Sequence, residues 1–597
     1  MWCPVSNRLA LTQALAELKP NGAQYDAALE RGHCVVLAGP GSGKTKTLTT
    51  AMARALMDDV VDPRGVACIT YNNECATELE DRLARFGVGN SDRSFIGTVH
   101  SFALTQVIAP YARCISKLLP DDFRVATSGE CRTAVEAAYK SVFGDTGNAH
   151  DRWRFAEEKR RRDVDRTCPA WKGKNLELVT FIEAYEAELR HKALIDFDDM
   201  PLIAFRMIKE HNWIRDALRA RFPVLFVDEY QDLGHALHEL VLLLCFESGI
   251  RLFAVGDADQ SIYGFNGANP GLLQDLTARD DVKTIHLRFN YRSGAKIIRA
   301  SLGALGEERD YCGMDGAAEG ELNFWPVEGD HDQQARYISE VALPSLLARG
   351  FQLDQIGILY RAAWLGDKVS DALKKTSIAV LRTDGNALVR RNSRLARFVE
   401  ACSRWVTGGW RDASPPYHQL LGQALAIVYG GRVSGAEEQA MTLQLMTFLR
   451  RGINCNETTH DWLTRFGREL LTPWQGIARN THQEWEVWSE LVARTDPARG
   501  LDMPLTIFSG RIDGSGRVTL STLHSAKGRE FDVVILFGIN AEDLPNWRDT
   551  KSERAMREAR RLFYVGVTRP RKELCMVFEK GNHSPWVAEL YRRSRQE

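Results

Sequence analysis

A glycine-rich segment after an apolar run carries the clearest chemistry in this sequence. The run at residues 34–37 is followed by Ala38, Gly39, Pro40, Gly41, Ser42, Gly43, Lys44 and Thr45. A buried strand that breaks into such a turn and then opens a helix directs several free N–H groups at one point, where an anion is stabilised. In this pattern Lys44 reaches the β and γ phosphates and the Thr45 hydroxyl contacts Mg²⁺. The segment therefore predicts a nucleotide site.

Two further apolar runs end in side chains that suit the same site. Residues 224–227 are followed by Asp228 and Glu229, where a P-loop ATPase places its metal-holding and water-activating carboxylates. We assign Asp228 to Mg²⁺ and Glu229 to the attacking water. Gln260 follows the run at 252–256 and is expected to sense the γ-phosphate of ATP. Without the glycine-rich segment, the acidic pair would instead indicate a helix N-terminus stabilised by its dipole.

Parallel sheets are the elements that must position these side chains. Short β-branched runs alternate with helical patterns in two stretches, which is typical of α/β proteins. We expect strands at 34–38, 66–70, 224–227, 252–256, 356–360, 518–522, 533–537 and 574–578. The segments 104–195 and 386–509 show helical periodicity and few strand patterns, so they are expected to be helical insertions. Core packing is the expected role of the apolar helix faces formed by Met441, Leu445, Phe448 and Leu449 and by Trp485, Trp488 and Val492.

Composition limits the other classes of protein. The chain has 597 residues, 44% apolar and 26% charged, with a formal net charge of −1. These values fit a globular protein of several domains, in which a nucleic acid would be held by a local groove and not by bulk charge. The twelve cysteines include no Cys-x-x-Cys pair, which argues against zinc and iron–sulfur sites and favours reduced thiols. No signal-peptide pattern or long apolar run is evident, so we expect a cytoplasmic location and no membrane partner.

An ordered series of motifs resembles the superfamily 1 DNA helicases of the UvrD/Rep/PcrA type. Besides the segments above, the motifs are Leu-Arg-Phe-Asn-Tyr-Arg-Ser at 287–293, Val-Thr-Leu-Ser-Thr-Leu-His-Ser-Ala-Lys-Gly-Arg-Glu-Phe-Asp at 518–532 and Arg-Arg-Leu-Phe-Tyr-Val-Gly-Val-Thr-Arg at 560–569. They run in family order from about residue 21 to 570. The resemblance implies two RecA-like domains with ATP between them, each interrupted by a helical insertion. It implies the first domain at 1–103 and 196–292 with its insertion at 104–195, and the second at 293–385 and 510–597 with a reduced insertion at 386–509.

The resemblance also assigns residues to the nucleotide. It implies that Gln24 reads adenine, that Tyr291 stacks on the base, and that Glu530 lies near the ribose. Lys46 stands where the family often has an adenine-side Arg, and the two are not equivalent at a stacked site. Arg292 and Arg569 match the arginines that reach the γ-phosphate, and such guanidinium groups can be worth about 10³–10⁵ in rate.

Single-stranded DNA is the partner that the resemblance implies. Translocation needs platforms that tolerate any base, together with polar groups for the backbone. The positions that match the family's DNA contacts are Tyr71, Asn73, Thr98, His100, Tyr263, Phe265 and His524. Departures from the family pattern include Asn266 in place of Arg and Glu74 in place of Lys, so individual contacts differ.

Two charged segments have more than one interpretation. The run Lys159, Arg160, Arg161 and Arg162, with Trp153 and Trp171 nearby, predicts a solvated charged face or, as the second reading, a DNA contact. The Asp-Phe-Asp-Asp stretch at 196–199 suggests a metal-dependent nuclease, but the family carries a similar stretch, so we interpret it as structural.

Two functions remain open from the sequence. The first is an ATP-driven 3′–5′ DNA translocase and helicase acting in repair, recombination or phage defence, whose polarity follows from the resemblance alone. The second is a DNA-stimulated ATPase subunit or DNA-end sensor in a nuclease-containing complex, with little unwinding by itself. Strand displacement by the isolated chain separates them.

Overall fold

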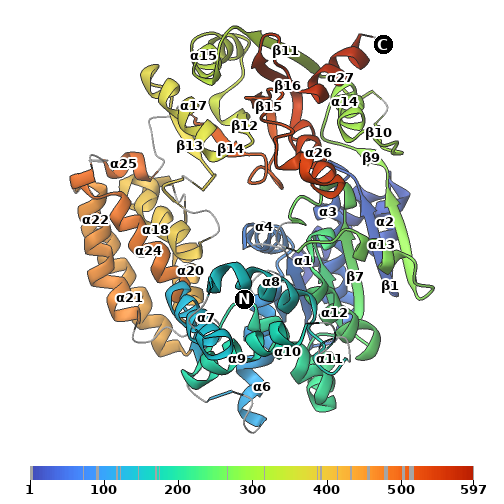
Figure 1. Ribbon diagram of the computed structural model, residues 1–597, viewed down its shortest axis with the longest axis vertical. Helices are drawn as coiled ribbons and strands as arrows, with labels where there is room; N and C mark the ends of the chain where they lie inside the picture. The colour runs from blue at the N-terminus through green and yellow to red at the C-terminus, as the bar shows by residue number, and fades with distance from the viewer. Residues whose placement is uncertain are drawn as a thin grey trace. The chain divides into compact units, whose positions relative to one another are not determined.

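Two six-stranded sheets with helical surroundings form the framework of the chain (Figure 1). The computed structural model describes residues 4–595 except 71–72, 89–92, 116–118, 121–122, 145–146, 169–170, 172, 174, 265–266, 315, 386, 390–392, 413–414, 430–432, 454–456, 476–481, 500–503 and 510–515. The chain forms two compact units. The first unit comprises Met1–Gln334, Leu359–Arg361 and Ala526–Glu597, and the second comprises Ala335–Ile358 and Ala362–Ser525. These units follow packing and not sheet membership, so the domain boundaries given above stay a proposal.

The first sheet is parallel and has the strand order β3-β2-β6-β7-β1-β8. Its strands are β1 (His33–Ala38), β2 (Val66–Thr70), β3 (Ser94–Thr98), β6 (Val224–Val227), β7 (Arg251–Gly256) and β8 (Val282–Leu287). Alternate residues of one strand enter different cores. Leu225 and Val227 of β6 belong to one cluster, whereas Val224 and Phe226 belong to the cluster on the other face. This alternation explains the continuous apolar runs, because both faces of these strands are buried.

Helices cover both faces of the first sheet. They are α1 (Pro4–Leu18), α2 (Gly22–Leu29), α3 (Lys44–Arg54), α4 (Asn73–Ala84), α5 (Val99–Phe102), α10 (Asp199–Glu210), α11 (Asn212–Arg221), α12 (His235–Leu242) and α13 (Gly271–Thr277), with π-helical turns η1 (Ala55–Asp59), η2 (Ala103–Ile108) and η5 (Leu243–Glu247). Because the strands are parallel, the loops after β1, β6 and β7 leave the same edge of the sheet. The glycine-rich segment, the Asp228–Glu229 pair and Gln260 follow these three strands at that edge.

The segment between η2 and α10 is mainly helical, as expected. It contains α6 (Ala109–Tyr111), α7 (Ser128–Phe143), α8 (Ala149–Arg162) and α9 (Leu176–His191), and the two-residue strands β4 (Arg124–Val125) and β5 (Leu194–Ile195). A capping box at Thr127 and Glu130 begins α7. Helices α7 and α9 pack together around Tyr139 and Phe181, whose ring centroids are 5.7 Å apart (Figure 1).

The second sheet has the order β11-β16-β15-β12-β14-β13. Its strands are β11 (Glu321–Val327), β12 (Ile356–Tyr360), β13 (Val380–Arg382), β14 (Val518–Thr522), β15 (Phe531–Phe537) and β16 (Pro570–Glu579). In the first compact unit, α14 (Ala295–Leu305) packs against α26 (Glu553–Val567) and α27 (Pro585–Ser594). A small ladder of β9 (Phe289–Asn290) and β10 (Cys312–Gly313) follows β8, and α15 (His331–Tyr337) follows β11.

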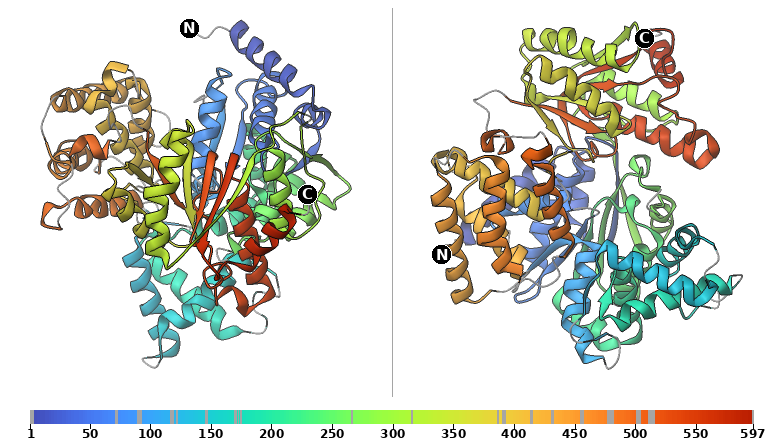
Figure 2. Two further views of the ribbon diagram at one scale, coloured as in Figure 1. Left: turned by 90° about the horizontal axis from the view of Figure 1, so that it is seen from above. Right: turned by 60° about the vertical axis from the view of Figure 1, so that its left-hand side comes forward.

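The second compact unit contains a helical bundle (Figure 2, right). Its helices are α18 (Arg394–Arg404), α19 (Trp410–Asp412), α20 (Tyr417–Tyr429), α21 (Gly435–Gly452), α22 (Thr459–Phe466), α23 (Thr472–Gln475), α24 (His482–Arg494) and α25 (Leu505–Phe508), and α16 (Leu343–Ala348) and α17 (Ala363–Lys375) lie earlier in the chain. The predicted face of α21 is buried, with Leu445 and Leu449 fully inaccessible. Trp485, Trp488 and Val492 are partly buried against the same cluster. Core packing, as predicted, is the role of both faces.

All eight predicted strands are present, to within a few residues at their ends. The longer strands that the sequence analysis missed are β3, β8, β11 and β13, and each lies at the edge of its sheet. None of them is as uniformly buried as the interior strands, and β11 is half-exposed or exposed along its whole length. Edge strands therefore lack the apolar runs from which the interior strands were recognised.

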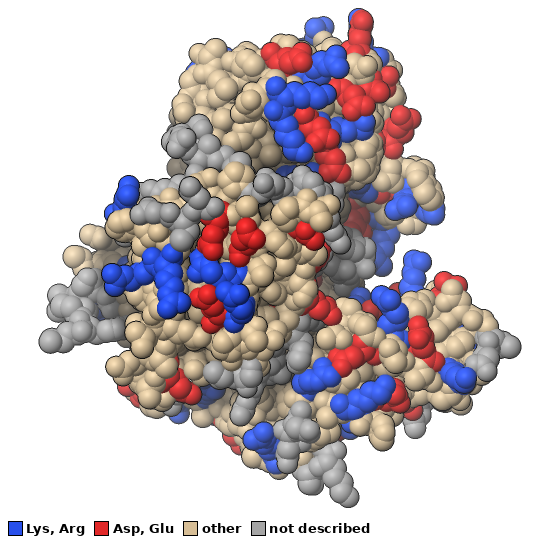
Figure 3. Space-filling model, turned by 90° about the vertical axis from the view of Figure 1, so that its left-hand side faces the viewer, with Lys and Arg blue, Asp and Glu red and all other residues tan. Residues whose placement is uncertain are grey.

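Side chains of both charges are interspersed on the face shown in Figure 3. This agrees with the balanced composition of 77 Lys and Arg against 78 Asp and Glu. Within the described part of the chain, no helix is both long and apolar enough to cross a membrane.

Candidate functional site

The glycine-rich segment forms a tight loop between β1 and α3. Gly41 and Gly43 adopt positive φ angles of 69° and 80°, which favour glycine, and Gly43 caps α3. The Ser42 hydroxyl donates to the Gly39 carbonyl at 2.7 Å and closes the turn. Lys44 Nζ donates to the Ala38 carbonyl at 3.2 Å and lies 3.7 Å from Asp257 Oδ2. The loop thus presents backbone N–H groups and one ammonium at the start of a helix, an arrangement that suits phosphate.

The three glycines of this loop each face another part of the site. A Cβ atom on Gly39 would lie 2.6 Å from the Tyr311 ring, and one on Gly41 would lie 2.5 Å from Asn290 Oδ1 and 2.7 Å from Arg292 Cβ. A Cβ atom on Gly43 would collide with the Gln24 amide. The glycines therefore allow close approach of side chains from residues 24, 290–292 and 311.

The predicted adenine residues lie beside this loop. Gln24 Nε2 donates to the Ser42 carbonyl at 2.8 Å, so its amide is fixed against the phosphate loop. Tyr291 N–H donates to the Gly41 carbonyl at 2.8 Å, and its hydroxyl accepts from Asn21 Nδ2 at 2.8 Å. Tyr291 is 47% exposed, which is compatible with stacking on a base. Lys46 pairs with Glu17 at 2.7 Å on the surface of α3.

The paired carboxylates after β6 have different environments. Burial and the neighbouring Glu229 raise the pKa of Asp228 to about 7. Burial would also raise the pKa of Glu229, but Lys44, Lys527 and the amide of Gln231 lower it. Glu229 has a φ of 52° and a ψ of 47°, a strained left-handed conformation for a residue other than glycine. The pKa values of the two adjacent carboxylates are thus shifted in opposite directions.

Gln260 connects the loop after β7 to the C-terminal motif. Its Nε2 donates to Asp257 Oδ2 at 2.5 Å, and its Oε1 accepts from Arg569 Nη2 at 3.1 Å. Arg569 is fully buried, and Nε donates to the Val565 carbonyl at 2.9 Å. Burial and the nearby Arg292 lower the pKa of Arg569 to about 10. Arg569 is therefore a buried cation bonded to Gln260, with Arg292 lowering its pKa and the Glu530 carboxylate opposing that effect.

Arg292 lies against the phosphate loop and is held by an acidic partner. Its Nη2 donates to Glu530 Oε1, and its Nη1 donates to the Thr568 carbonyl at 3.3 Å. Glu530 Oε2 also accepts from Arg571 at 2.9 Å. The carboxylate that the resemblance places near a ribose is thus engaged by two arginines in this structure.

Three residues of the site were given no chemical role by the sequence analysis. Lys527 Nζ donates to Asp232 Oδ2 at 2.5 Å and to the Gln260 carbonyl at 2.6 Å. Lys527 stands in a motif of the sequence. Its pairing with Asp232, 295 positions away, could not be predicted from the local sequence. Tyr311 belongs to no motif, so the sequence held no signal for it.

The predicted DNA contacts are only partly covered by the structure. Tyr71 and Phe265 lie outside the described residues, as does Asn266, and the side chain of Asn73 is also not described. Thr98 caps α5 through its hydroxyl, which accepts from Ser101 N–H at 3.2 Å. The His100 ring stacks on Phe197 at 3.8 Å, and burial lowers the pKa of His100 to about 3. His100 is therefore neutral and available as a hydrogen-bonding group, not as a cation.

Tyr263 is half-buried beside the nucleotide residues. Lys527 Nζ lies 5.3 Å from the centroid of its ring, within cation–π range. The same ammonium is bonded to the Gln260 carbonyl. Tyr263 is thereby linked to the residue expected to sense the γ-phosphate. His524 belongs to the second compact unit, where it follows β14.

The basic side chains at 159–162 form ion pairs with acidic residues of the same unit. Arg160 is buried and donates to Asp196 Oδ2 at 2.6 Å, to Glu186 Oε1 at 2.9 Å and to Asp199. Arg161 pairs with Asp198 at 3.0 Å. Neither the solvated-face nor the DNA-contact interpretation fits Arg160, because that side chain neutralises the buried carboxylates of the 196–199 stretch. No cluster of three or more His, Cys, Asp or Glu suited to a metal occurs among the described residues, and the 196–199 carboxylates bind arginine.

Arg160→Ala should lower the free energy of unfolding by about 3–5 kcal/mol, because Asp196 and Asp199 would remain buried without their cation. Urea unfolding followed by tryptophan fluorescence measures the change. Arg162→Ala is the matched control: Arg162 is 55% exposed and pairs with Asp163, so its loss should cost less than about 1 kcal/mol. Equal effects of the two variants would show that Arg160 is not the cation that holds this segment.

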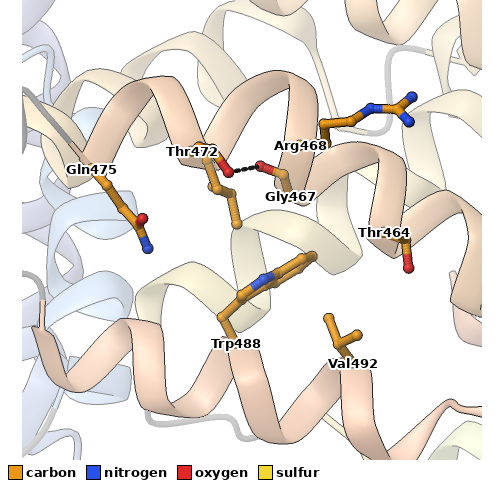
Figure 4. A pocket seen from close by; sticks show the side chains of 8 residues that line it. Thr464, Gly467, Arg468, Thr472, Gln475, Trp488 and Val492 are labelled. Atoms are coloured by element: carbon orange, nitrogen blue, oxygen red, sulfur yellow. Dashed lines mark hydrogen bonds between the residues drawn. The ribbon is translucent and has the colours of Figure 1, made fainter.

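A pocket in the helical bundle is lined by none of the predicted site residues. Gly467, Arg468, Thr472 and Trp488 are among its lining side chains, and the Thr472 hydroxyl donates to the Gly467 carbonyl at 3.0 Å (Figure 4). The Trp488 indole packs on Gly467, where a Cβ atom would lie 3.0 Å from the ring. The indole thus packs tightly on Gly467, and the lining offers no group of residues suited to catalysis.

The loop after β1, the carboxylates after β6 and the polar segment after β7 define a P-loop protein with two parallel sheets. The family model described as the UvrD/REP helicase N-terminal domain matches residues 21–280, and the model for the UvrD-like helicase C-terminal domain matches residues 508–581. Together they match more than half of the chain, which belongs to the UvrD/Rep helicase family.

Curated relatives resemble the chain over most of its length. The ATP-dependent DNA helicase PcrA of Leuconostoc citreum is 26% identical over 92% of this chain and 80% of its own. DNA helicase II of Haemophilus influenzae is 25% identical over 95% and 86%, respectively. The ATP-dependent DNA helicase Rep of Salmonella typhimurium is 24% identical over 94% and 90%.

Proposed function

We propose that this chain is an ATP-dependent single-stranded DNA translocase and 3′–5′ DNA helicase. The observation that carries the proposal is the meeting of Gln260 and Arg569 at 3.1 Å, with Arg292 beside Gly41 of the phosphate loop. Gln260 and Arg569, more than 300 positions apart in the chain, are thereby joined, and Arg292 lies against the phosphate loop. The names of the curated relatives support ATP and DNA as the substrates, and the polarity follows the family resemblance.

The residues divide the chemistry of ATP hydrolysis among them. Lys44 and the loop amides bind the phosphates, while Gln24 and Tyr291 orient the adenine. Glu229 accepts a proton from the attacking water, and its lowered pKa keeps it ionised for that task. Arg292 and Arg569 spread positive charge over the transferring phosphoryl group.

The oxygen donors of the site suit Mg²⁺. Thr45 follows Lys44 at the start of α3, and Asp228 is a buried carboxylate directly after β6, which is separated from β1 by β7 in the same sheet. Hydroxyl and carboxylate oxygens are the ligands that this hard cation prefers. Thr45 and Asp228 would hold Mg²⁺, which when bound neutralises phosphate charge.

Lys527 provides a physical link between hydrolysis and movement on DNA. Its ammonium contacts Asp232, the backbone carbonyl of Gln260 and the ring of Tyr263. We expect the side chain of Gln260 to release Arg569 when it bonds a phosphate oxygen. A shift of the Gln260 backbone would move Lys527, which is bonded to that backbone, and with it the Tyr263 ring. ATP hydrolysis would thereby be coupled to Tyr263, the proposed stacking residue for DNA.

Strand displacement tests the proposed function. The purified chain should unwind a duplex with a 3′ single-stranded tail in the presence of ATP and Mg²⁺, and should leave a 5′-tailed duplex intact. Unwinding of the 5′-tailed duplex would contradict the polarity. DNA-stimulated hydrolysis with no displacement of either substrate would contradict the helicase assignment and favour an ATPase subunit that works with a nuclease or another protein.

Tyr263→Ala should weaken single-stranded DNA binding by about 1–3 kcal/mol, since a base would lose its stacking platform. Fluorescence anisotropy with a labelled oligothymidine gives the affinity. Tyr263→Phe keeps the ring and should bind as the wild type does. If Tyr263→Ala also binds normally, the ring belongs to the protein interior and not to the DNA path.

A further inference from the structure

The hydroxyl of Tyr564 is a buried donor without a hydrogen-bond partner among the described residues. Tyr564 lies in α26, the helix that also leads into Arg569, and its side chain is completely inaccessible. A buried hydroxyl of this kind is costly unless it is bonded, so its place in the fold calls for an explanation. Asp232 Oδ1 and Arg292 Nε, both in residues of the nucleotide site, are also buried without partners.

The surroundings of Tyr564 belong to the phosphate-binding machinery. Helix α26 packs on η6 (Ala258–Gln260), the turn that carries the proposed phosphate sensor. Burial and the charges of Asp257 and Asp259 raise the pKa of Tyr564 well above its ordinary value, so the hydroxyl keeps its proton. Tyr311, whose ring lies on Gly39 of the phosphate loop, is also a neighbour.

The nearby carboxylates accept hydrogen bonds from other groups. Asp257 Oδ1 accepts from Asp259 N–H at 3.0 Å, and Asp257 Oδ2 accepts from Gln260 at 2.5 Å. Both oxygens of Asp259 accept from Arg309, each at 2.7 Å. The Tyr564 hydroxyl bonds to neither carboxylate and has no other partner among the described residues, so it is available to a ligand oxygen.

We propose that the Tyr564 hydroxyl donates a hydrogen bond to an oxygen of the terminal phosphate of bound ATP. This inference rests on the proposed function and adds a substrate contact to it. ADP lacks the terminal phosphate, so the contact distinguishes ATP from ADP. Tyr564 would then act with Arg569, five residues later, as a reader of the nucleotide state.

Tyr564→Phe removes the hydroxyl and keeps the ring. The variant should bind a non-hydrolysable ATP analogue at least about tenfold more weakly, because a hydrogen bond to a charged group is lost. Its affinity for ADP should stay within about twofold of the wild type. The melting temperature of the nucleotide-free protein should stay the same or rise, since no bond of the fold is removed.

Tyr185→Phe is the matched control. The Tyr185 hydroxyl is also buried, but it donates to Asp196 Oδ2 at 2.7 Å, far along the chain from the nucleotide residues. This variant should melt about 1–4 °C lower and bind both nucleotides normally. We therefore expect Tyr564→Phe to lose affinity for the ATP analogue without loss of stability, and Tyr185→Phe to lose stability without loss of nucleotide affinity.

Several results would overturn the proposal for Tyr564. They are unchanged affinity for the ATP analogue, an equal loss of ADP affinity, or a fall in melting temperature like that of Tyr185→Phe. A loss of turnover with unchanged analogue affinity would assign the hydroxyl to the attacking water and contradict the terminal-phosphate contact. A wild-type chain that binds neither nucleotide, with Lys44→Ala no different, would contradict the proposed function itself.

Discussion

Arg569→Ala should lower DNA-stimulated ATP turnover by about 10³–10⁵-fold, because a guanidinium that neutralises the transferring phosphoryl group is removed. Arg569 bonds the amide oxygen of Gln260 and lies near Arg292, and both contacts place its charge beside the expected γ-phosphate. Nucleotide affinity should fall much less than turnover, since the loop amides and Lys44 remain. Turnover at saturating ATP, compared with analogue affinity, measures the difference.

Two companions make the Arg569 result interpretable. Arg569→Lys keeps the charge but loses the fork of donors, so its turnover should lie between those of the wild type and Arg569→Ala. Arg557→Ala removes an arginine from the same helix that is 67% exposed and pairs with Glu553, and it should turn over normally. Near-normal turnover of Arg569→Ala would remove this residue from the phosphate site.

Glu229→Gln should lower turnover by about 10²–10⁴-fold, since the amide cannot accept the proton of the attacking water. The fold already holds this residue in a strained left-handed conformation and lowers its pKa with Lys44 and Lys527 nearby. The variant should still bind ATP and single-stranded DNA, so the complex with unhydrolysed ATP should accumulate. A rapid single-turnover assay measures the chemical step directly.

The control for Glu229→Gln is Glu239→Gln, an equivalent change on the exposed side of α12. It should hydrolyse ATP at the wild-type rate. Should Glu229→Gln retain a normal single-turnover rate, the water would have to be activated by another group, and Asp232 would be the next residue to test.

The interior of the fold was predictable from the sequence because both faces of its strands are buried. Apolar runs such as residues 224–227 and 533–537 indicate interior strands, because every residue of these segments is buried. The edge strands β3, β8, β11 and β13 were missed since one side of each is open and their residues are mixed. Pairing with a neighbour, which the local sequence does not encode, defines them.

The residues of the candidate nucleotide site could be proposed from the sequence where they stand in motifs, and otherwise they could not. Lys44, Asp228 and Arg292 follow strands in recognisable patterns. Tyr311 reaches Gly39 through the loop after α14, which is held by the short β9 and β10 ladder and by Arg309 on Asp259. Such long-range contacts depend on the assembled fold.

Arg160 shows the reverse error. A run of four basic residues reads as a charged surface, yet the second member of the run is buried against carboxylates 26 to 39 residues away. The sequence shows that Arg160 is charged, but it does not show which carboxylates pair with it. The same run therefore contributes to structure, with Arg161 and Arg162 on its exposed side.

A double-mutant cycle on ATP turnover tests the central claim, that Lys44 and Arg569 act on one triphosphate. No hydrogen bond or ion pair joins these two side chains directly among the described residues, and the path between them through the protein runs by way of Asp257 and Gln260. The same cycle in a Gln260→Ala background therefore isolates the coupling that runs through the nucleotide. The account predicts strong non-additivity, with the double variant within about tenfold of the worse single variant. Losses that simply multiply would show that the two residues act independently and would contradict the account.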